Sequence, residues 1–499
     1  MTFKLKPFPS KKACAIFEHV PGLLGDLCKS GEIGRRAGFR FQSRKGWGFE
    51  SLLLHQVFLR GRRMKHESSV VTCQIEFHPE APHQRARVRI QQPVVSALYK
   101  QALDLHQRQV QARGFGKGTV PIAYLERTYR AFIIEHMKEF LLNHCVINTL
   151  CNQMCQEHLL CVGDPLIESI YVEPDKIAEF TFSLSQTKIQ EKTAWKKVSF
   201  HPPQRRNYKD IDKQVETFIE NECTPTLTAD KKPQISAGDW VLFSLSLVDT
   251  HKDTKVLNYD DHLWLRMGTE EPDYEAVKLF SERSVGDSFI SDDVFFQQYL
   301  SKQWDSEYHY LVTIKDHISN SHIPKEHLAR LFFCQDQEEL KDLCVQMFSF
   351  RQDLSLRREM VTSLFKTLQK HIQILIPREL VIQQERYVLR EVQRTPDYPV
   401  YRLQKDFRDK IRQLAEKQLY ETAIIDYIAS QEKVSAEPED ITAYLALHLH
   451  PRTKDLLNFH LPLTQVNGQE QPIPANMIKL ACLREKALNY ILHTLARTA

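Results

Sequence analysis

The sequence lacks the features that would place it in a membrane or a secretory pathway. No apolar stretch approaches the ~20 residues needed to cross a bilayer, and the lysines near the N-terminus precede no continuous apolar segment of the kind found in signal peptides. The 11 cysteines are unevenly spread and include no CxxC pair, which argues against a disulfide framework and a zinc site. We therefore expect a cytoplasmic protein with reduced thiols, no membrane partner and no metal.

Motifs for catalysis and cofactor binding are also missing. There is no HExxH, no nucleophile elbow and no Ser-His-Asp order, and the pair His448/His450 has no carboxylate at ligand spacing. The run GFGKGT is not a phosphate loop, because Lys117 is followed by Gly118 where that motif needs Ser or Thr. These absences predict a protein that uses no cofactor and no ATP.

The first 63 residues differ in kind from the rest of the chain. Residues 1–63 hold 13 Lys and Arg against 4 Asp and Glu, and 8 of the 16 glycines, without sustained periodicity. One interpretation is a disordered basic extension that binds nucleic acid by charge alone. We favour another: residues 31–56 resemble the translation of a transfer-RNA gene, so 1–63 is a non-native extension and the native chain begins at or near Met64. The intact mass of the endogenous protein decides between the two.

Residues 64–188 have the pattern of a small α+β domain. Alternation predicts two N-terminal strands, apolar residues at helical spacing predict two helices, of which the second is broken once, and two closing strands follow. In order, these elements are expected at 70–77, 85–91, 94–111, 121–156, 170–172 and 179–185.

Three glycines in five residues interrupt the two predicted helices. Gly114, Gly116 and Gly118 permit a tight turn, and Pro121 suits the first turn of the following helix. Phe115 and Lys117 lie between the glycines, so an aromatic ring and a cation share one short exposed loop. The simpler alternative is that the glycines only turn the chain.

The remaining chain divides by periodicity into three parts. Residues 189–232 are polar and Lys-rich, with a helix expected at 211–222, and we interpret them as a linker arm. Residues 233–318 have strand-like patterning and predict a β-rich domain. Residues 319–499 return to helical spacing and predict an all-helical domain. The expected fold class is α+β multidomain.

The order of these motifs resembles trigger factor, the bacterial ribosome-associated chaperone. The ββ unit, the helix, the Gly-Phe-x-Lys-Gly-x-Val-Pro loop and the next helix are similar to its ribosome-binding domain over 70–188. The residues from Trp264 to Gly268 and from Val285 to Phe289 occur in the order of its inserted FKBP-like domain. The Pro-Arg-Glu-Leu-Val run that begins at Pro377 is similar to a helix entry in its arm-bearing domain.

The resemblance implies that the loop docks on the large ribosomal subunit near the exit tunnel. Phe115 would pack against apolar surface, and Lys117 would pair with acidic protein side chains or ribosomal RNA phosphate. The family places Arg where this chain has Gly116, and Arg113 lies two residues before the ring. We therefore expect docking that is weaker and more salt-sensitive than in the family.

The FKBP-like resemblance implies a prolyl isomerase, which is the alternative function. Such an enzyme lowers a barrier of ~18–20 kcal/mol by holding the prolyl ring in a dry aromatic cradle. Phe243 and Tyr274 are the candidate cradle residues here, but the acidic side chains of Glu270, Glu271 and Asp273 would wet its floor. We expect a degraded isomerase site in 233–318.

The helical domain is expected to hold nascent and unfolded polypeptides. Adaptable apolar side chains close in sequence suit varied clients; they are Met347, Phe348, Phe350, Met360 and Phe365. The alternative is that most of them form the core. Whether the chain forms a homodimer off the ribosome is left open by the sequence.

Overall fold

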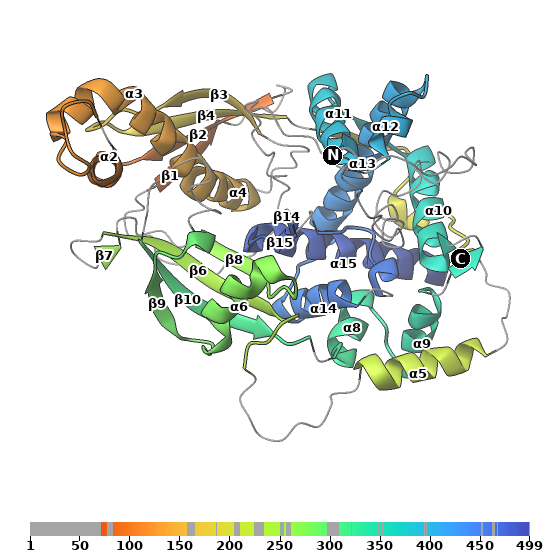
Figure 1. The fold of residues 1–499 in the computed structure, drawn as a ribbon. Coiled ribbons are helices and arrows are strands. Elements are labelled where there is room, and N and C mark those ends of the chain that lie inside the picture. The colour runs from red at the N-terminus through yellow and green to blue at the C-terminus, as the bar shows by residue number, and fades with distance from the viewer. Residues whose placement is uncertain are drawn as a thin grey trace, which may run out of the picture.

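The computed structural model contains helices and antiparallel sheets arranged in three units (Figure 1). The structure describes residues 71–76, 83–110, 112–156, 165–185, 187–203, 210–223, 234–249, 254–255, 261–296, 309–320, 322–347, 349–351, 354–393, 395, 397–450, 453–461, 465–466 and 468–498. The predictions for residues 1–63, the proposed start at Met64 and the turn after the first strand lie outside the described residues.

The first unit, called the N-unit (residues 71–185), is a four-stranded antiparallel sheet covered by helices. The strands follow the order β1-β2-β4-β3. The bounds are β1 (Val71–Glu76), β2 (His83–Ile90), β3 (Leu166–Tyr171), β4 (Ala178–Ser185), α2 (Gln92–Gln109), α3 (Ile122–Leu141), the π-helix η2 (Leu142–Val146) and α4 (Ile147–Gln156). The predicted break in the second helix is this π-helical turn.

Strand β2 shows why the N-unit sheet has one dry face. Ala86, Val88 and Ile90 are fully buried, as period-2 alternation requires. The intervening arginines point outward, and Arg87 and Arg89 both pair with Glu179 of β4, at 3.4 and 2.7 Å. The alternation seen in the sequence thus separates the core from a charged outer face.

The middle unit (residues 234–318) is a sheet that takes one strand from the far end of the chain. Its strand order is β16-β8-β6-β10-β9, with β7 on β6. The bounds are β6 (Trp240–Asp249), β7 (Thr254–Lys255), β8 (Asp261–Arg266), the short helix η4 (Glu271–Asp273), α6 (Tyr274–Ser281), β9 (Ser288–Ser291), β10 (His309–Ile318) and β16 (Ile473–Pro474). In β16, Ile473 pairs with Trp264 and Pro474 with Leu263.

The helical unit (residues 322–498) packs around its last helix, α15 (Ala475–Thr498). Its other helices are α8 (Lys325–Phe332), α9 (Gln337–Val345), α10 (Leu356–His371), α11 (Arg378–Gln393), α12 (Tyr398–Tyr401), α13 (Phe407–Gln431), α14 (Pro438–Leu449) and η5 (Thr453–Leu456). Short strands accompany them: β11 (Ser349–Arg351), β12 (Leu354–Ser355), β13 (Ile372–Leu375), β14 (Gln465–Val466) and β15 (Gln469–Glu470).

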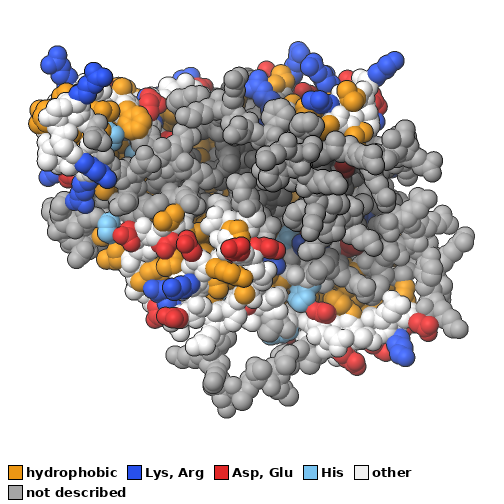
Figure 2. Space-filling view, in the orientation of Figure 1, with side chains coloured by type: hydrophobic (Ala, Val, Ile, Leu, Met, Phe, Trp, Pro, Cys, Tyr) orange, Lys and Arg blue, Asp and Glu red, His pale blue; other side chains and the backbone are white. Residues whose placement is uncertain are grey.

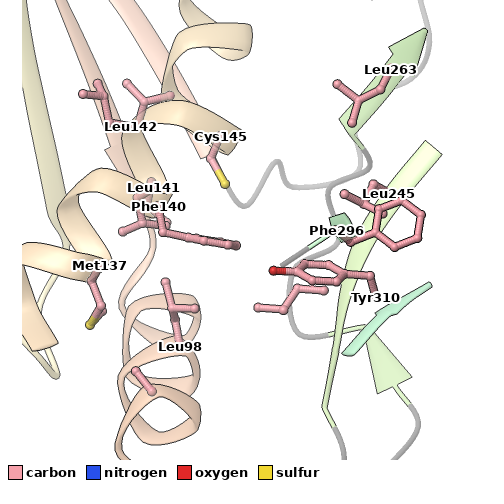
Figure 3. Packing of buried hydrophobic residues seen from close by; sticks show 14 of the residues in the cluster. Leu98, Met137, Phe140, Leu141, Leu142, Cys145, Leu245, Leu263, Phe296 and Tyr310 are labelled. Atoms are coloured by element: carbon pink, nitrogen blue, oxygen red, sulfur yellow. The ribbon is translucent and has the colours of Figure 1, made fainter. Parts of the chain in front are cut away.

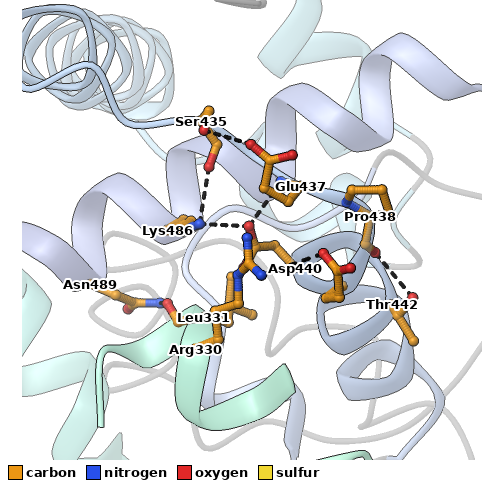
Figure 4. Close-up of polar contacts among 10 residues, drawn as sticks. Arg330, Leu331, Ser435, Glu437, Pro438, Asp440, Thr442, Lys486 and Asn489 are labelled. Atoms are coloured by element: carbon orange, nitrogen blue, oxygen red, sulfur yellow. Dashed lines mark hydrogen bonds and ion pairs between the residues drawn. The ribbon is translucent and has the colours of Figure 1, made fainter. Parts of the chain in front are cut away.

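Helix α15 carries three consecutive charged residues inside the helical unit. Arg484, Glu485 and Lys486 are all at least nine-tenths buried. Each has a partner on another element: Arg484 binds both carboxylate oxygens of Asp426, Arg357 lies 3.3 Å from Glu485, and Lys486 Nζ lies 2.6 Å from Asp440 (Figure 4). Removing one partner would leave a buried unpaired charge, so these pairs fix how the helices face α15.

The segment between the N-unit and the middle unit is packed rather than free. It contains β5 (Lys188–Glu191), η3 (Trp195–Lys197) and α5 (Ile211–Cys223). β5 pairs with β13 of the helical unit, and Trp195 lies buried in the core around α10, α13 and α15. The predicted linker arm is thus partly built into the helical unit.

Candidate functional site

The loop between α2 and α3 projects from the N-unit, and its two ends are buried. Ala112 and Val120 are buried at those ends, and every residue from 113 to 119 is exposed. Two turns shape the loop: the amide of Phe115 donates to the carbonyl of Ala112, and the amide of Thr119 donates to that of Gly116, each at 3.1 Å. The φ angles of Gly114 (+89°) and Gly118 (+79°) lie where only glycine is unstrained.

Two residues that the sequence analysis missed hold the loop in place. Gln107 Nε2, on α2, donates a 2.7 Å hydrogen bond to the carbonyl of Val120 and so closes the base of the loop. The ring of Tyr124, on the first turn of α3, lies 5.6 Å from the ring of Phe115. Tyr124 is three residues after Pro121, a spacing that places it on the exposed first turn of the helix.

The loop presents apolar and cationic groups side by side. Phe115 and Tyr124 are 36% and 38% exposed, and no ion pair to Arg113 or Lys117 exists among the described residues. Between residues 108 and 130 the sequence has five Lys and Arg and one Glu. Figure 2 shows Lys and Arg side chains gathered at the end of the N-unit where α2 and α3 lie. This surface suits an acidic or phosphate-bearing partner with apolar patches.

His106 contributes less positive charge to this surface than an ordinary histidine would. Its ring is half-buried between Tyr129 and Phe132, with centroids 4.8 and 5.6 Å away. This burial lowers the pKa of His106 below its ordinary value. The main cations of the loop region are therefore its arginines and Lys117.

Gly116 is not required by the shape of the loop. Its φ lies outside the left-handed region, and an added Cβ would meet only the Thr119 hydroxyl at 3.4 Å, an ordinary contact. Nothing in the backbone excludes an arginine there, the residue that the resemblance leads one to expect.

Comparisons with known proteins identify the family of the chain. Residues 74–220 match the family model described as bacterial trigger factor protein (TF), and residues 338–492 match that of the bacterial trigger factor protein (TF) C-terminus. The chain belongs to the trigger factor family.

Individual members of the trigger factor family are distant relatives. "Trigger factor" of Rickettsia canadensis is 23% identical over 403 residues, covering 79% of this chain and 87% of its own. That of Rickettsia massiliae is 25% identical over 299 residues, covering 59% and 64%. A solved structure of the trigger factor chaperone, from work on promiscuous substrate recognition in folding and assembly, covers 85% of this chain and all of its own, at 16% identity and a TM-score of 0.34.

Phe243 and Tyr274, the two residues considered for a prolyl cradle, differ in solvent exposure. Phe243 is fully buried, with its ring 5.3 Å from Phe280 and 6.0 Å from Phe296, whereas Tyr274 is 62% exposed at the start of α6. Phe243 is therefore part of a packed core and Tyr274 part of the surface. Asp273 does not wet a cradle floor, because it is buried and accepts the amide of Glu470 at 2.8 Å.

The candidate client surface of the helical unit is largely core. Met347, Met360 and Phe365 are each less than a tenth exposed, so the alternative weighed for them is correct. The side chains of Phe348 and Phe350 lie outside what the structure describes. Among the described residues of this unit, the most exposed large apolar side chains are instead Val400 and Leu403, at 62% and 79%.

Within the described ranges, no group of three His, Cys, Asp or Glu side chains is placed to hold a metal ion. Nor is any helix there both long enough and apolar enough to cross a bilayer.

Proposed function

We propose that this protein is an ATP-independent, ribosome-associated chaperone of the cytoplasm that binds nascent polypeptides near the exit tunnel and assists their folding. The observation that carries the proposal is the loop at 113–119, exposed along its whole length, with Phe115 and Lys117 at a tip anchored by buried residues. Membership of the trigger factor family supports the same function.

In this proposal the loop supplies two kinds of contact to the large subunit. Phe115, backed by Tyr124, buries apolar area against a ribosomal protein. Lys117 and Arg113 pair with acidic side chains or with ribosomal RNA phosphates, which makes binding salt-dependent. A loop with one cation fewer than the family pattern binds more weakly.

Co-sedimentation of the full chain with ribosomes tests the docking role. The double variant Phe115→Ala/Lys117→Glu is expected to bind at least about tenfold more weakly, since it loses one apolar anchor and reverses one charge. Tyr171→Ala/Lys176→Glu is the matched control, because it removes an exposed aromatic ring and a lysine elsewhere on the N-unit. If the Phe115→Ala/Lys117→Glu variant sediments with ribosomes as well as the control and the wild type do, the assignment is refuted.

The chaperone role has its own measurement, which is suppression of aggregation of a chemically unfolded protein in the absence of ATP. A prolyl isomerase is the alternative, and a proline-limited refolding assay on the full chain distinguishes it. The enclosed position of Phe243 favours the chaperone without isomerase activity.

A homodimer off the ribosome is a further part of the proposal. Analytical ultracentrifugation of the chain without ribosomes measures its oligomeric state.

A further inference from the structure

The aromatic core of the middle unit opens toward the N-unit. One continuous cluster of buried side chains runs through both units. Figure 3 shows Phe140, from the end of α3, directed toward Tyr310 and Phe296 of the middle unit, with Leu98 of α2 below it. All four side chains are less than a tenth exposed. The N-unit thus covers apolar surface that the middle unit does not bury by itself.

A polar contact accompanies this apolar one. Gln101 Nε2, on α2, donates a 3.0 Å hydrogen bond to the carbonyl of Val248 near the end of β6. Gln101 is 9% exposed, and its Oε1 atom has no hydrogen-bond partner among the described residues. A buried acceptor without a partner favours separation, since water would satisfy it. Gln101 therefore stabilises the contact through its Nε2 hydrogen bond and weakens it through its unsatisfied Oε1.

We propose that Leu98, Gln101 and Phe140 form an intramolecular plug over a peptide-binding face of the middle unit, made of Leu245, Phe296, Tyr310 and the Val248 carbonyl. The occupant that replaces the plug is an extended, apolar segment of unfolded polypeptide. Its chemistry is given by the plug itself, which supplies an aromatic side chain and, beside it, one N–H donor for the Val248 carbonyl. This inference rests on the proposed chaperone function, for which it names a client site.

The plug is connected to the loop at 113–119 through one helix, α2. Gln101 and Gln107 lie on α2, less than two helical turns apart; the first binds the middle unit and the second binds the end of the loop. Both use the same donor, a side-chain amide, on a backbone carbonyl. They are therefore a matched pair for separating the two contacts.

The test compares Gln101→Ala with Gln107→Ala in the full chain, by small-angle X-ray scattering and by binding of a fluorescein-labelled Gly–Ser peptide with a central Leu-Phe-Leu. Gln101→Ala is expected to increase the radius of gyration and to tighten peptide binding about three- to tenfold, because a larger fraction of molecules has the face uncovered. Gln107→Ala should change neither quantity and should weaken ribosome co-sedimentation instead. The same peptide with a central Ser-Gly-Ser should bind no variant.

Two results would overturn the inference. One is an opened Gln101→Ala chain that binds the peptide no better than the wild type. The other is that both Gln101→Ala and Phe140→Asp, which places a charge in the contact, leave the scattering and the peptide binding unchanged. If these variants still suppress aggregation as well as the wild type does, the proposed chaperone function survives and only the plug is refuted. A wild-type chain that neither suppresses aggregation nor sediments with ribosomes would instead refute the proposed function.

Discussion

The middle unit has two neighbours, and the structure joins it to them in different ways. With the helical unit it shares a sheet, through β16 and β8, and a core in which Trp240 and Trp264 pack among residues of α8, α14 and α15. With the N-unit, it shares the buried contact around Phe140 and the Gln101–Val248 hydrogen bond. Backbone pairing within a shared sheet resists separation more than side-chain packing beside an unsatisfied acceptor does.

Polar contacts close the middle unit where the chain enters and leaves it, and one further contact joins it to the helical unit. Asp239, where the chain enters the middle unit, accepts the amide of Asn320 and lies 2.8 Å from the ring of His317, where the chain leaves it. Asp273 binds the amide of Glu470 on β15, and Gly268 has no room for a side chain because a Cβ would collide with the Asp273 carboxylate. The middle and helical units are therefore expected to behave as one body, and the N-unit as the part that moves.

The largest expected effect comes from removing a shared tryptophan. Trp264→Ala should lower the free energy of unfolding by about 3–5 kcal/mol, because the side chain is 4% exposed in the common core. Urea unfolding followed by circular dichroism should show the middle and helical units shifting together in one transition. Tyr274→Ala, on the surface of the same unit, is the control and should change little. Separate unfolding transitions for the two units would show that the middle and helical units do not behave as one body.

The next effect concerns the buried carboxylate between the same two units. Asp273→Ala should cost about 1–2 kcal/mol, because the amide of Glu470 loses its acceptor while buried. The intrinsic fluorescence of Trp240 and Trp264, both in this joint, reports the change during unfolding. Glu275→Ala removes an exposed carboxylate nearby, and an equal loss in that variant would contradict the role given to Asp273.

A change in the N-unit should alter ribosome binding and leave the stability of the contact between the middle and helical units unchanged. Gly116→Arg restores the cation of the family pattern where the backbone permits it, and should tighten ribosome binding about tenfold at low salt, with the gain vanishing as salt rises. Gly118→Arg adds the same charge at a φ of +79°, so it should be strained and gain less. Equal gains from both variants would show that only net charge matters.

The smallest effect is a pH dependence of the free energy of unfolding, caused by Asp273 between the middle and helical units. Burial raises the pKa of Asp273 above its ordinary 3.8, so the folded chain binds a proton more readily than the unfolded chain and this residue favours folding more as pH falls toward that value. Asp273→Asn keeps an oxygen acceptor but does not titrate. The stability of the wild type relative to this variant should rise as pH falls, and a constant difference would refute the assignment.

Local patterns predicted most elements, because their causes lie within a few residues. The alternation in β2, the helix α5 and the helix beginning after Pro377 all follow from spacing and from proline. The exposure of Phe115 and Lys117 was predicted from the glycines around them. Tyr124 and Gln107 were missed, since their roles depend on where the loop folds back.

Contacts between distant segments could not be predicted in this way. Arg484, Glu485 and Lys486 are of residue types that are mostly exposed, and only the folded chain brings Asp426, Arg357 and Asp440 to them from other helices. Strand β16 has two residues and includes a proline, so nothing local marks it as part of a sheet. Gln101 likewise gives no signal of its contact with Val248.

The pairing of β16 with β8 also has a consequence for how this protein is made. About two hundred residues separate the paired strands, so at ~5–20 residues per second the edge of β8 waits about 10 to 40 s for its partner during synthesis. Through that time an unpaired strand edge is open to other chains. A protein proposed to shield incomplete chains thus passes through a stage at which its own incomplete chain exposes such an edge.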